Sequence, residues 1–221
     1  QYDIWQTQQR FPRVLTRFAL DAETIEVANP FGGNLLVLIP VGLDLGVMDI
    51  TVSGAVEAPH YFKSTTRETP LSTWLALRDA EVPWAQISGQ NFMFSIPTSM
   101  VQELDDPRPT VEAWDLAMDG YMELFSRPTT RHRAEYFIAD VRNPAGAFGP
   151  GYPTIMGSYE PGMEDAGWNP LNIVDPEKIR PSASDLFIVL HEYGHGHWFP
   201  TLPGETEVNV NLPATYIYHQ K

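Results

Sequence analysis

The chain has 221 residues, 43% of them hydrophobic, which is enough to bury the core of one large domain or two small ones. It carries 14 basic and 28 acidic residues, a formal net charge of −14, which argues against broad nucleic-acid binding because phosphate neutralisation needs clustered Lys and Arg. The absence of cysteine excludes disulfides and thiolate ligands, so any metal must be held by nitrogen and oxygen atoms.

The first quarter of the chain has the pattern of short β-strands. Apolar runs at residues 24–27, 35–39 and 48–52 are predicted strands, and residues 29–33 form a natural turn between the first two. Helical patterns follow at residues 71–78 and 111–125. The structural class is therefore expected to change near residue 65.

The most informative motif is His191-Glu192-Tyr193-Gly194-His195, a complete HExxH. On a helix, His191 and His195 stand one turn apart on the same face, so both imidazoles can reach one zinc ion. Glu192 then projects beside the open coordination position, where a carboxylate that is not a ligand can take a proton from the attacking water. Two histidines and a carboxylate are a common catalytic zinc set, so the motif predicts a zinc-dependent hydrolase.

The residues before the motif favour a helix. Capping side chains are available at 181–185, and the apolar run at 186–190 can bury the helix in a core. Residues 148–156 are predicted to form a loop that leads into a strand beside this helix. Zinc peptidases often bind substrate backbone along a sheet edge, so this segment is a candidate cleft wall, with an ordinary surface loop as the alternative.

Two glutamates follow the motif, and either can be the third ligand. Asn211 lies four residues after Glu207, on the same face of a helix, where its amide can orient a ligand by hydrogen bonding. Asn209 stands in the same relation to Glu205. The spacing therefore leaves both glutamates open.

The run at residues 191–218, HEYGHGHWFPTLPGETEVNVNLPATYIY, resembles the enhancin-type, or M60-like, metallopeptidases. Their pattern is HExxH, a variable spacer and then G-x-x-E. Here the glycine is Gly204 and the glutamate three residues later is Glu207. The resemblance implies that Glu207 is the third ligand and leaves Glu205 as a neighbour.

The resemblance extends upstream to about residue 29 through less specific segments. It includes a glycine-containing turn at 29–36 and a strand at 58–62. The family's tryptophan-bearing helix, proline-tryptophan segment and acidic turn before a helix are similar to residues 73–74, 81–85 and 104–107. The similarity thus covers most of the chain.

Two features depart from the family pattern. Pro213 lies inside the segment that should be a helix carrying Glu207, where it is expected to kink or end the helix and to displace Asn211. The chain also stops at Lys221, whereas the family's domains usually continue with further helices that complete the cleft. The catalytic subdomain is therefore expected to be truncated at its C-terminus.

Three neighbouring residues have alternative interpretations. His197 lies two residues after a candidate ligand and points in a different direction on a helix, which favours a supporting or surface role. Tyr216 and Tyr218 follow the third-ligand segment and are candidates for stabilising an oxyanion, with core packing as the alternative.

We predict an α+β fold, with a β-rich N-terminal subdomain over residues 1–65 and a mixed α/β, zincin-like catalytic subdomain over 66–221 that contains the HExxH helix. The predicted function is that of a zinc-dependent endopeptidase. Its metal ligands would be His191, His195 and Glu207, with Glu192 as general base and Asn211 orienting a ligand. The resemblance implies extracellular or cell-surface proteolysis of a protein or glycoprotein substrate, often mucin-like and O-glycosylated.

Two rival functions stay open at this point. One is a non-catalytic binding or structural protein that retains the fold, and the other is a zinc hydrolase that acts on something other than peptides. No apolar stretch approaches the roughly 20 residues that span a bilayer, so no transmembrane segment is expected. Gln1 begins no recognisable signal peptide, and the sequence indicates no oligomeric state.

Overall fold

The computed structural model describes residues 16–30, 32–40, 42–44, 46–131, 133–139, 148–149, 152–156, 170–179, 186–197 and 204–220. These residues form a mixed α/β fold around a six-stranded sheet with the strand order β1-β2-β3-β4-β6-β5. Within these ranges, no helix is both long enough and apolar enough to cross a membrane.

The sheet is mixed in strand direction. Its strands are β1 (His60–Phe62), β2 (Trp84–Ser88), β3 (Phe92–Pro97), β4 (Glu135–Ala139), β5 (Phe148–Gly149) and β6 (Thr154–Met156). β1 pairs with β2, β3 with β4, and β4 with β6 in parallel. The pairs β2–β3 and β5–β6 are antiparallel, so β5 lies at one end of the strand order.

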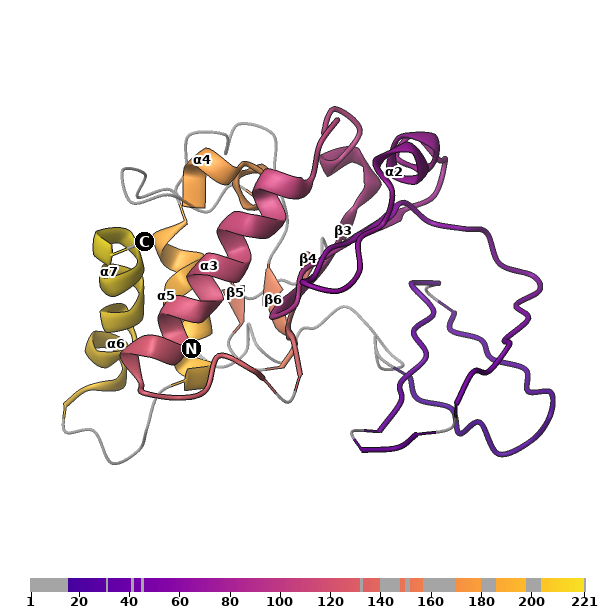
Figure 1. Cartoon of the computed structure of the whole chain (residues 1–221), viewed down its shortest axis with the longest axis horizontal. Coiled ribbons are helices and arrows are strands. Elements are labelled where there is room, and N and C mark those ends of the chain that lie inside the picture. The colour runs from indigo at the N-terminus through magenta and orange to yellow at the C-terminus, as the bar shows by residue number, and fades with distance from the viewer. Residues whose placement is uncertain are drawn as a thin grey trace.

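Most of the helices gather at one end of the molecule, away from residues 16–56, whereas the helix at residues 71–77 lies apart from them (Figure 1). The helices are α2 (Leu71–Leu77), α3 (Arg108–Leu124), α4 (Pro176–Ile179), α5 (Phe187–His197), α6 (Thr206–Asn209) and α7 (Asn211–Gln220), with 3-10 turns η1 (Thr98–Met100) and η2 (Pro170–Val174). α7 packs against both α3 and α5. This packing brings the C-terminal residues to the helix that carries the HExxH sequence.

The helices predicted at 71–78 and 111–125 are confirmed as α2 and α3. α3 begins three residues earlier than predicted, because the Asp106 carboxylate accepts a hydrogen bond from the Arg108 amide at 3.0 Å and a proline occupies the first turn. Trp114 and Met118 are buried as expected, whereas Leu116 is exposed.

An aromatic core joins the sheet to α3 and α5. The ring of Trp114 on α3 meets Phe94 of β3 edge-on at 5.1 Å between centroids, and Phe94 in turn meets Phe137 of β4 at 5.5 Å. Tyr193 of α5 completes the group, 6.0 Å from Trp114. One face of α5 is therefore anchored in the core, which leaves the opposite face for chemistry.

The three strands predicted within residues 24–52 are wrong for this structure. The described residues between 16 and 59 form no strand, and many of their apolar side chains are exposed, among them Leu38, Val47 and Val56. A strand needs a neighbouring backbone to satisfy its amide and carbonyl groups, and these residues have no such pairing within the described part of the chain.

The turn predicted at residues 29–33 is present. The Gly32 amide donates to the Asn29 carbonyl at 2.9 Å, and Gly32 has a φ of 66°, a conformation that favours glycine. The Asn34 side chain also donates to the Ser95 hydroxyl of β3 at 3.2 Å. The division of the chain at residue 65 stays a prediction; β1 and β2, on either side of it, belong to one sheet.

Candidate metal centre

Three side chains from two helices converge beside α5. His191 and His195 lie on α5, and Glu207 lies on α6. His191 Nε2 is 3.0 Å from Glu207 Oε2, and His195 Nε2 is 3.6 Å from the same oxygen. One candidate ligand atom from each residue lies within 4.8 Å of the others. We call these three residues the metal cluster.

The helical period of α5 separates its packing face from its reactive face. Val189, Leu190 and Tyr193 are buried in the core. His191 and His195 are four residues apart, and their rings lie 5.0 Å apart between centroids on the other face. Each side chain keeps 17% of its surface exposed, so both can reach an ion from solvent. The capping residues predicted at 181–185 lie outside the described residues.

A close helix contact places α6 beside α5. A Cβ atom on Gly194 would lie 2.5 Å from the carbonyl oxygen of Val210, so only glycine permits this approach. Gly204, with a φ of 121°, precedes α6 in a conformation that side-chain-bearing residues rarely adopt. Together these glycines let Glu207, whose side chain is 71% exposed, approach the two histidines.

Asn211 links two members of the metal cluster. Its Nδ2 donates to the Glu207 carbonyl at 2.8 Å, which identifies Oδ1 as the acceptor for His191 Nδ1 at 2.6 Å. His191 therefore carries a proton on Nδ1, and its Nε2 faces Glu207. The predicted displacement of Asn211 does not occur.

Pro213 is accommodated without distorting this arrangement. Val210 separates α6 from α7, and Pro213 occupies the third position of α7. Amide groups in the first turn of a helix have no helical acceptor, so a proline there removes no hydrogen bond. The break between α6 and α7 thus precedes the proline rather than following it.

Glu192 lies next to the metal cluster but is not one of its three candidate ligands. Its Oε2 is 4.0 Å from His195 Nε2 and has no hydrogen-bond partner among the described residues. Burial raises the pKa of the Glu192 carboxyl, an effect that His195 and His191 oppose and Glu207 reinforces. The site thus contains a desolvated carboxylate with a free oxygen.

The remaining candidates point elsewhere. Glu205 is exposed at the N-terminal boundary of α6 and is not part of the metal cluster. The Tyr216 hydroxyl donates to Glu123 at 3.3 Å, and the Tyr218 hydroxyl accepts from the Leu186 amide at 3.2 Å. These contacts favour the packing interpretation of both tyrosines.

His197 is buried rather than at the surface. Its side chain is 3% exposed and contacts Arg131 and Glu135. Sequence patterns gave no sign of this contact, because Arg131 is 66 residues away. Gly194 did carry a signal, since a glycine inside a helix is unfavourable and often marks a close packing contact.

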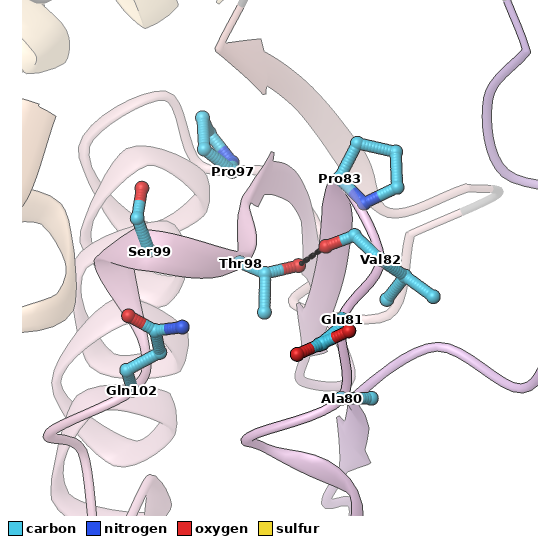
Figure 2. Close-up of a pocket in the computed structure, with 8 residues that line it drawn as sticks. All are labelled: Ala80, Glu81, Val82, Pro83, Pro97, Thr98, Ser99 and Gln102. Carbon is cyan, nitrogen blue, oxygen red and sulfur yellow. Dashed lines mark hydrogen bonds between the residues drawn. The ribbon is translucent and has the colours of Figure 1, made fainter.

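The segment at 148–156 contributes the outer strands of the sheet. β5 pairs with β6 and also contacts α5, so a strand of this segment lies beside the helix, but it is formed by residues 148–149, where the sequence predicted a loop. A separate hollow of about 310 Å³ lies between the beginning of β2 and η1, where Thr98 donates to the Val82 carbonyl (Figure 2). None of its lining residues belongs to the metal cluster.

Comparison with known proteins identifies the family. Residues 54–221 match Peptidase M60, enhancin and enhancin-like. The chain belongs to this family. The M60-like assignment made from the sequence is thereby confirmed, and with it a metallopeptidase family.

Two curated relatives of this M60 chain carry names that refer to a channel. It is 34% identical over 221 residues to the TRPM8 channel-associated factor homolog of Danio rerio and 30% identical over 213 residues to TRPM8 channel-associated factor 2 of Homo sapiens. The alignments cover 97% and 95% of this chain, respectively, but only 22% of each relative. The chain therefore spans about a fifth of their length.

Solved structures share the fold of this M60 chain. A conserved protein of unknown function from Bacillus anthracis str. Ames aligns with a TM-score of 0.60 at 14% identity, over 75% of this chain and 34% of that one. A metallopeptidase from Bacteroides thetaiotaomicron aligns with a TM-score of 0.51 at 16% identity, over 72% of this chain and 26% of that one. At these identities the likeness concerns the fold alone.

Proposed function

We propose that this chain is the catalytic region of a zinc-dependent endopeptidase. The observation that carries the proposal is the convergence of His191, His195 and Glu207 beside the buried carboxylate of Glu192. Membership of a metallopeptidase family also supports this proposal.

The residues of the metal cluster fit zinc. Two imidazole nitrogens and one carboxylate oxygen form a catalytic donor set that leaves a position open. Because His191 holds a proton on Nδ1, its Nε2 in the neutral form offers a lone pair only 3.0 Å from Glu207 Oε2. Two lone pairs at that distance require a positive charge, which either a proton or a metal ion can supply.

Glu192 is the group best placed to move a proton. When bound, zinc would polarise the scissile carbonyl and acidify a water molecule. The free, desolvated oxygen of Glu192 can accept the proton of that water and deliver it to the leaving amine. Its raised pKa makes the carboxylate a stronger base than an exposed glutamate.

The sheet edge supplies a place for the substrate. β5 ends the strand order and contacts α5, so an extended peptide can pair with it and run past the metal cluster. We propose protein or glycoprotein substrates, including mucin-like O-glycosylated proteins, and an extracellular or cell-surface location. Both rest on the resemblance to enhancin-type peptidases.

The test measures zinc content and cleavage of a mucin-type glycoprotein by the same preparations. Glu192→Gln should retain zinc and lose turnover by roughly 10²–10⁴-fold, because it removes the proton acceptor but no ligand. Glu207→Gln should lose zinc and activity together. Glu205→Gln, two residues away and outside the metal cluster, is the matched control and should behave like the parent.

Each outcome discriminates between functions. A folded parent without zinc would exclude the metal site, and bound zinc without any proteolysis that depends on Glu192 would exclude the peptidase. Zinc-dependent hydrolysis of a different bond would favour the other hydrolase. Equal effects of Glu205→Gln and Glu207→Gln would contradict the assignment of the third ligand.

The relatives favour one second candidate, a binding module that associates with a channel protein. Two of them are named TRPM8 channel-associated factors, a name that describes an association rather than a reaction. Co-precipitation with TRPM8 that is equal for the parent and for Glu192→Gln, without proteolysis by either, would support this candidate over the peptidase.

A further inference from the structure

A buried polar group lies at the C-terminal end of α5. His197, the last residue of α5, directs its Nδ1 to the Tyr193 carbonyl at 2.7 Å. A carbonyl only accepts, so the proton of the neutral imidazole is on Nδ1 and its Nε2 is an acceptor.

Arg131 bonds to that acceptor and to the sheet at the same time. Its Nη2 donates to His197 Nε2, and its Nη1 donates to Glu135 Oε1 at 2.6 Å. Arg131 lies between α3 and β4, and Glu135 is the first residue of β4. We call this three-residue group the Arg131 fork. It joins the last turn of α5 to the first residue of β4.

The Arg131 fork is enclosed by protein. The side chains of Arg131, His197 and Glu135 are 6%, 3% and 17% exposed, and the ring of Tyr121 stacks on His197 at 4.6 Å between centroids. Taking charged groups out of water is costly, and apolar residues of similar volume often stabilise a fold as well or better. A buried ionic group is thus weak evidence for stability alone and is better explained by the conformation that it specifies.

The fork acts on the turn that contains a candidate ligand. The terminal turn of a helix opens more readily than its middle unless side chains anchor it, and the Arg131 fork anchors the last described turn of α5 to β4. His195 lies in this turn, and its Nε2 reaches Glu207 only while the turn stays helical. The fork lies on the opposite side of the helix and does not contact the metal cluster.

We propose that Arg131 and His197 are positioning residues that fix the last turn of α5 and thereby direct His195 toward Glu207. The part of this inference that concerns metal binding rests on the proposed zinc site. The part that concerns the helix end does not, because it can be measured on metal-free protein.

The experiment compares the parent with Arg131→Met, Arg131→Lys and Ser95→Ala. Arg131→Met removes the fork, and Arg131→Lys keeps the charge but cannot bond to two partners in a fixed plane. Ser95→Ala is the control, because it removes a buried hydrogen bond of 2.9 Å to Tyr136 within the sheet. Amide hydrogen exchange over residues 191–197 of metal-free protein is measured first, and then the visible spectrum and affinity with added cobalt(II).

Both arginine variants should lose exchange protection in the last turn of α5 while the sheet stays protected. Their cobalt(II) affinity should fall by roughly tenfold or more, with a changed visible spectrum. Ser95→Ala should change neither reading. If Arg131→Met does not fold, Arg131→Lys alone decides the question.

Unchanged protection in Arg131→Lys, or a loss spread evenly over the whole chain, would overturn the proposal. A parent that binds no cobalt(II) would instead count against the proposed zinc site. The exchange comparison would then decide the role of the fork by itself.

Discussion

Gly194 of α5 lies so close to Val210 that a Cβ atom at Gly194 would be 2.5 Å from the Val210 carbonyl oxygen. This contact sets the separation between α5, which carries both histidines, and the junction of α6 and α7, which carries Glu207 and Asn211. A glycine inside a helix costs about 0.5–1 kcal/mol relative to alanine. The close approach of the two segments offsets that cost.

Gly194→Ala should therefore weaken both the fold and the metal cluster. The added methyl group has to displace backbone, since its nearest neighbour is a carbonyl oxygen. Overpacking of this kind costs typically ~1–3 kcal/mol. The shift of α6 should also reduce zinc affinity, which calorimetric titration of the metal-free protein with zinc would measure.

Gly196→Ala is the matched control for this prediction. It lies in the same helix, and a Cβ atom there meets no described residue within 4 Å. Alanine should therefore stabilise the helix by about 0.5–1 kcal/mol and leave zinc affinity unchanged. Similar behaviour of the two variants in thermal unfolding and zinc titration would contradict the role given to the Gly194 contact.

The features predicted best from the sequence are those that depend on the repeat of a single helix. His191 and His195 share a face because they belong to one helix with a fixed repeat. Glu207 belongs to another element, and its approach depends on the turn at Gly204 and on the contact of Gly194 with Val210. Those contacts are non-local, so spacing alone left Glu205 and Glu207 as alternatives.

The same contrast explains the fold. Residues 111–125 carry an apolar stripe typical of an amphipathic helix, and residues 111–124 of them lie in α3. The apolar run at 35–39 has the composition of a strand, but a strand also needs a paired neighbour, which its residues cannot specify. β5 and β6 were located only approximately, because strands of two and three residues carry little pattern.

Asn211→Ala should lower zinc affinity without unfolding the protein. The change removes the acceptor for His191 Nδ1 and the tie to the Glu207 carbonyl, so both the tautomer and the approach of α6 become less fixed. Loss of such a partner typically costs 10–100-fold in metal affinity. Competition with a chromogenic zinc chelator would measure the change.

Thr215→Ala serves as the control for Asn211→Ala. Thr215 lies one turn later on α7, and its hydroxyl bonds only to the Asn211 carbonyl among the contacts described. Removing it should leave zinc affinity within error of the parent. An equal loss in both variants would show that the effect comes from α7 as a whole and not from the His191 contact.

Tyr193→Phe should stabilise the metal-free protein. The Tyr193 hydroxyl is buried and has no hydrogen-bond partner among the described residues. A buried unpaired polar group costs about 1–3 kcal/mol, so its removal should raise the free energy of unfolding. Tyr121→Phe should instead lower that free energy by about 1 kcal/mol, because the Tyr121 hydroxyl donates to the Leu190 carbonyl. Urea unfolding at neutral pH separates the two, and a loss of stability in both would refute the prediction for Tyr193.

The same two tyrosines should make the fold sensitive to alkali. Burial raises the pKa of both Tyr121 and Tyr193 well above the ordinary value of 10.0. Above about pH 10 the unfolded chain loses protons that the folded chain retains, so the free energy of unfolding must fall as pH rises.

Each buried tyrosine contributes a slope of about 1.4 kcal/mol per pH unit in that range and nothing well below it. Urea unfolding between pH 9 and about pH 11.5, with tyrosinate absorbance followed in parallel, measures the slope. Tyr121→Phe and Tyr193→Phe should each reduce this slope by the contribution of one proton, about 1.4 kcal/mol per pH unit, because phenylalanine has no proton to lose. Tyrosinate absorbance that reaches its full value while the protein is still folded would contradict the burial of these hydroxyls, since ionisation would then not require unfolding.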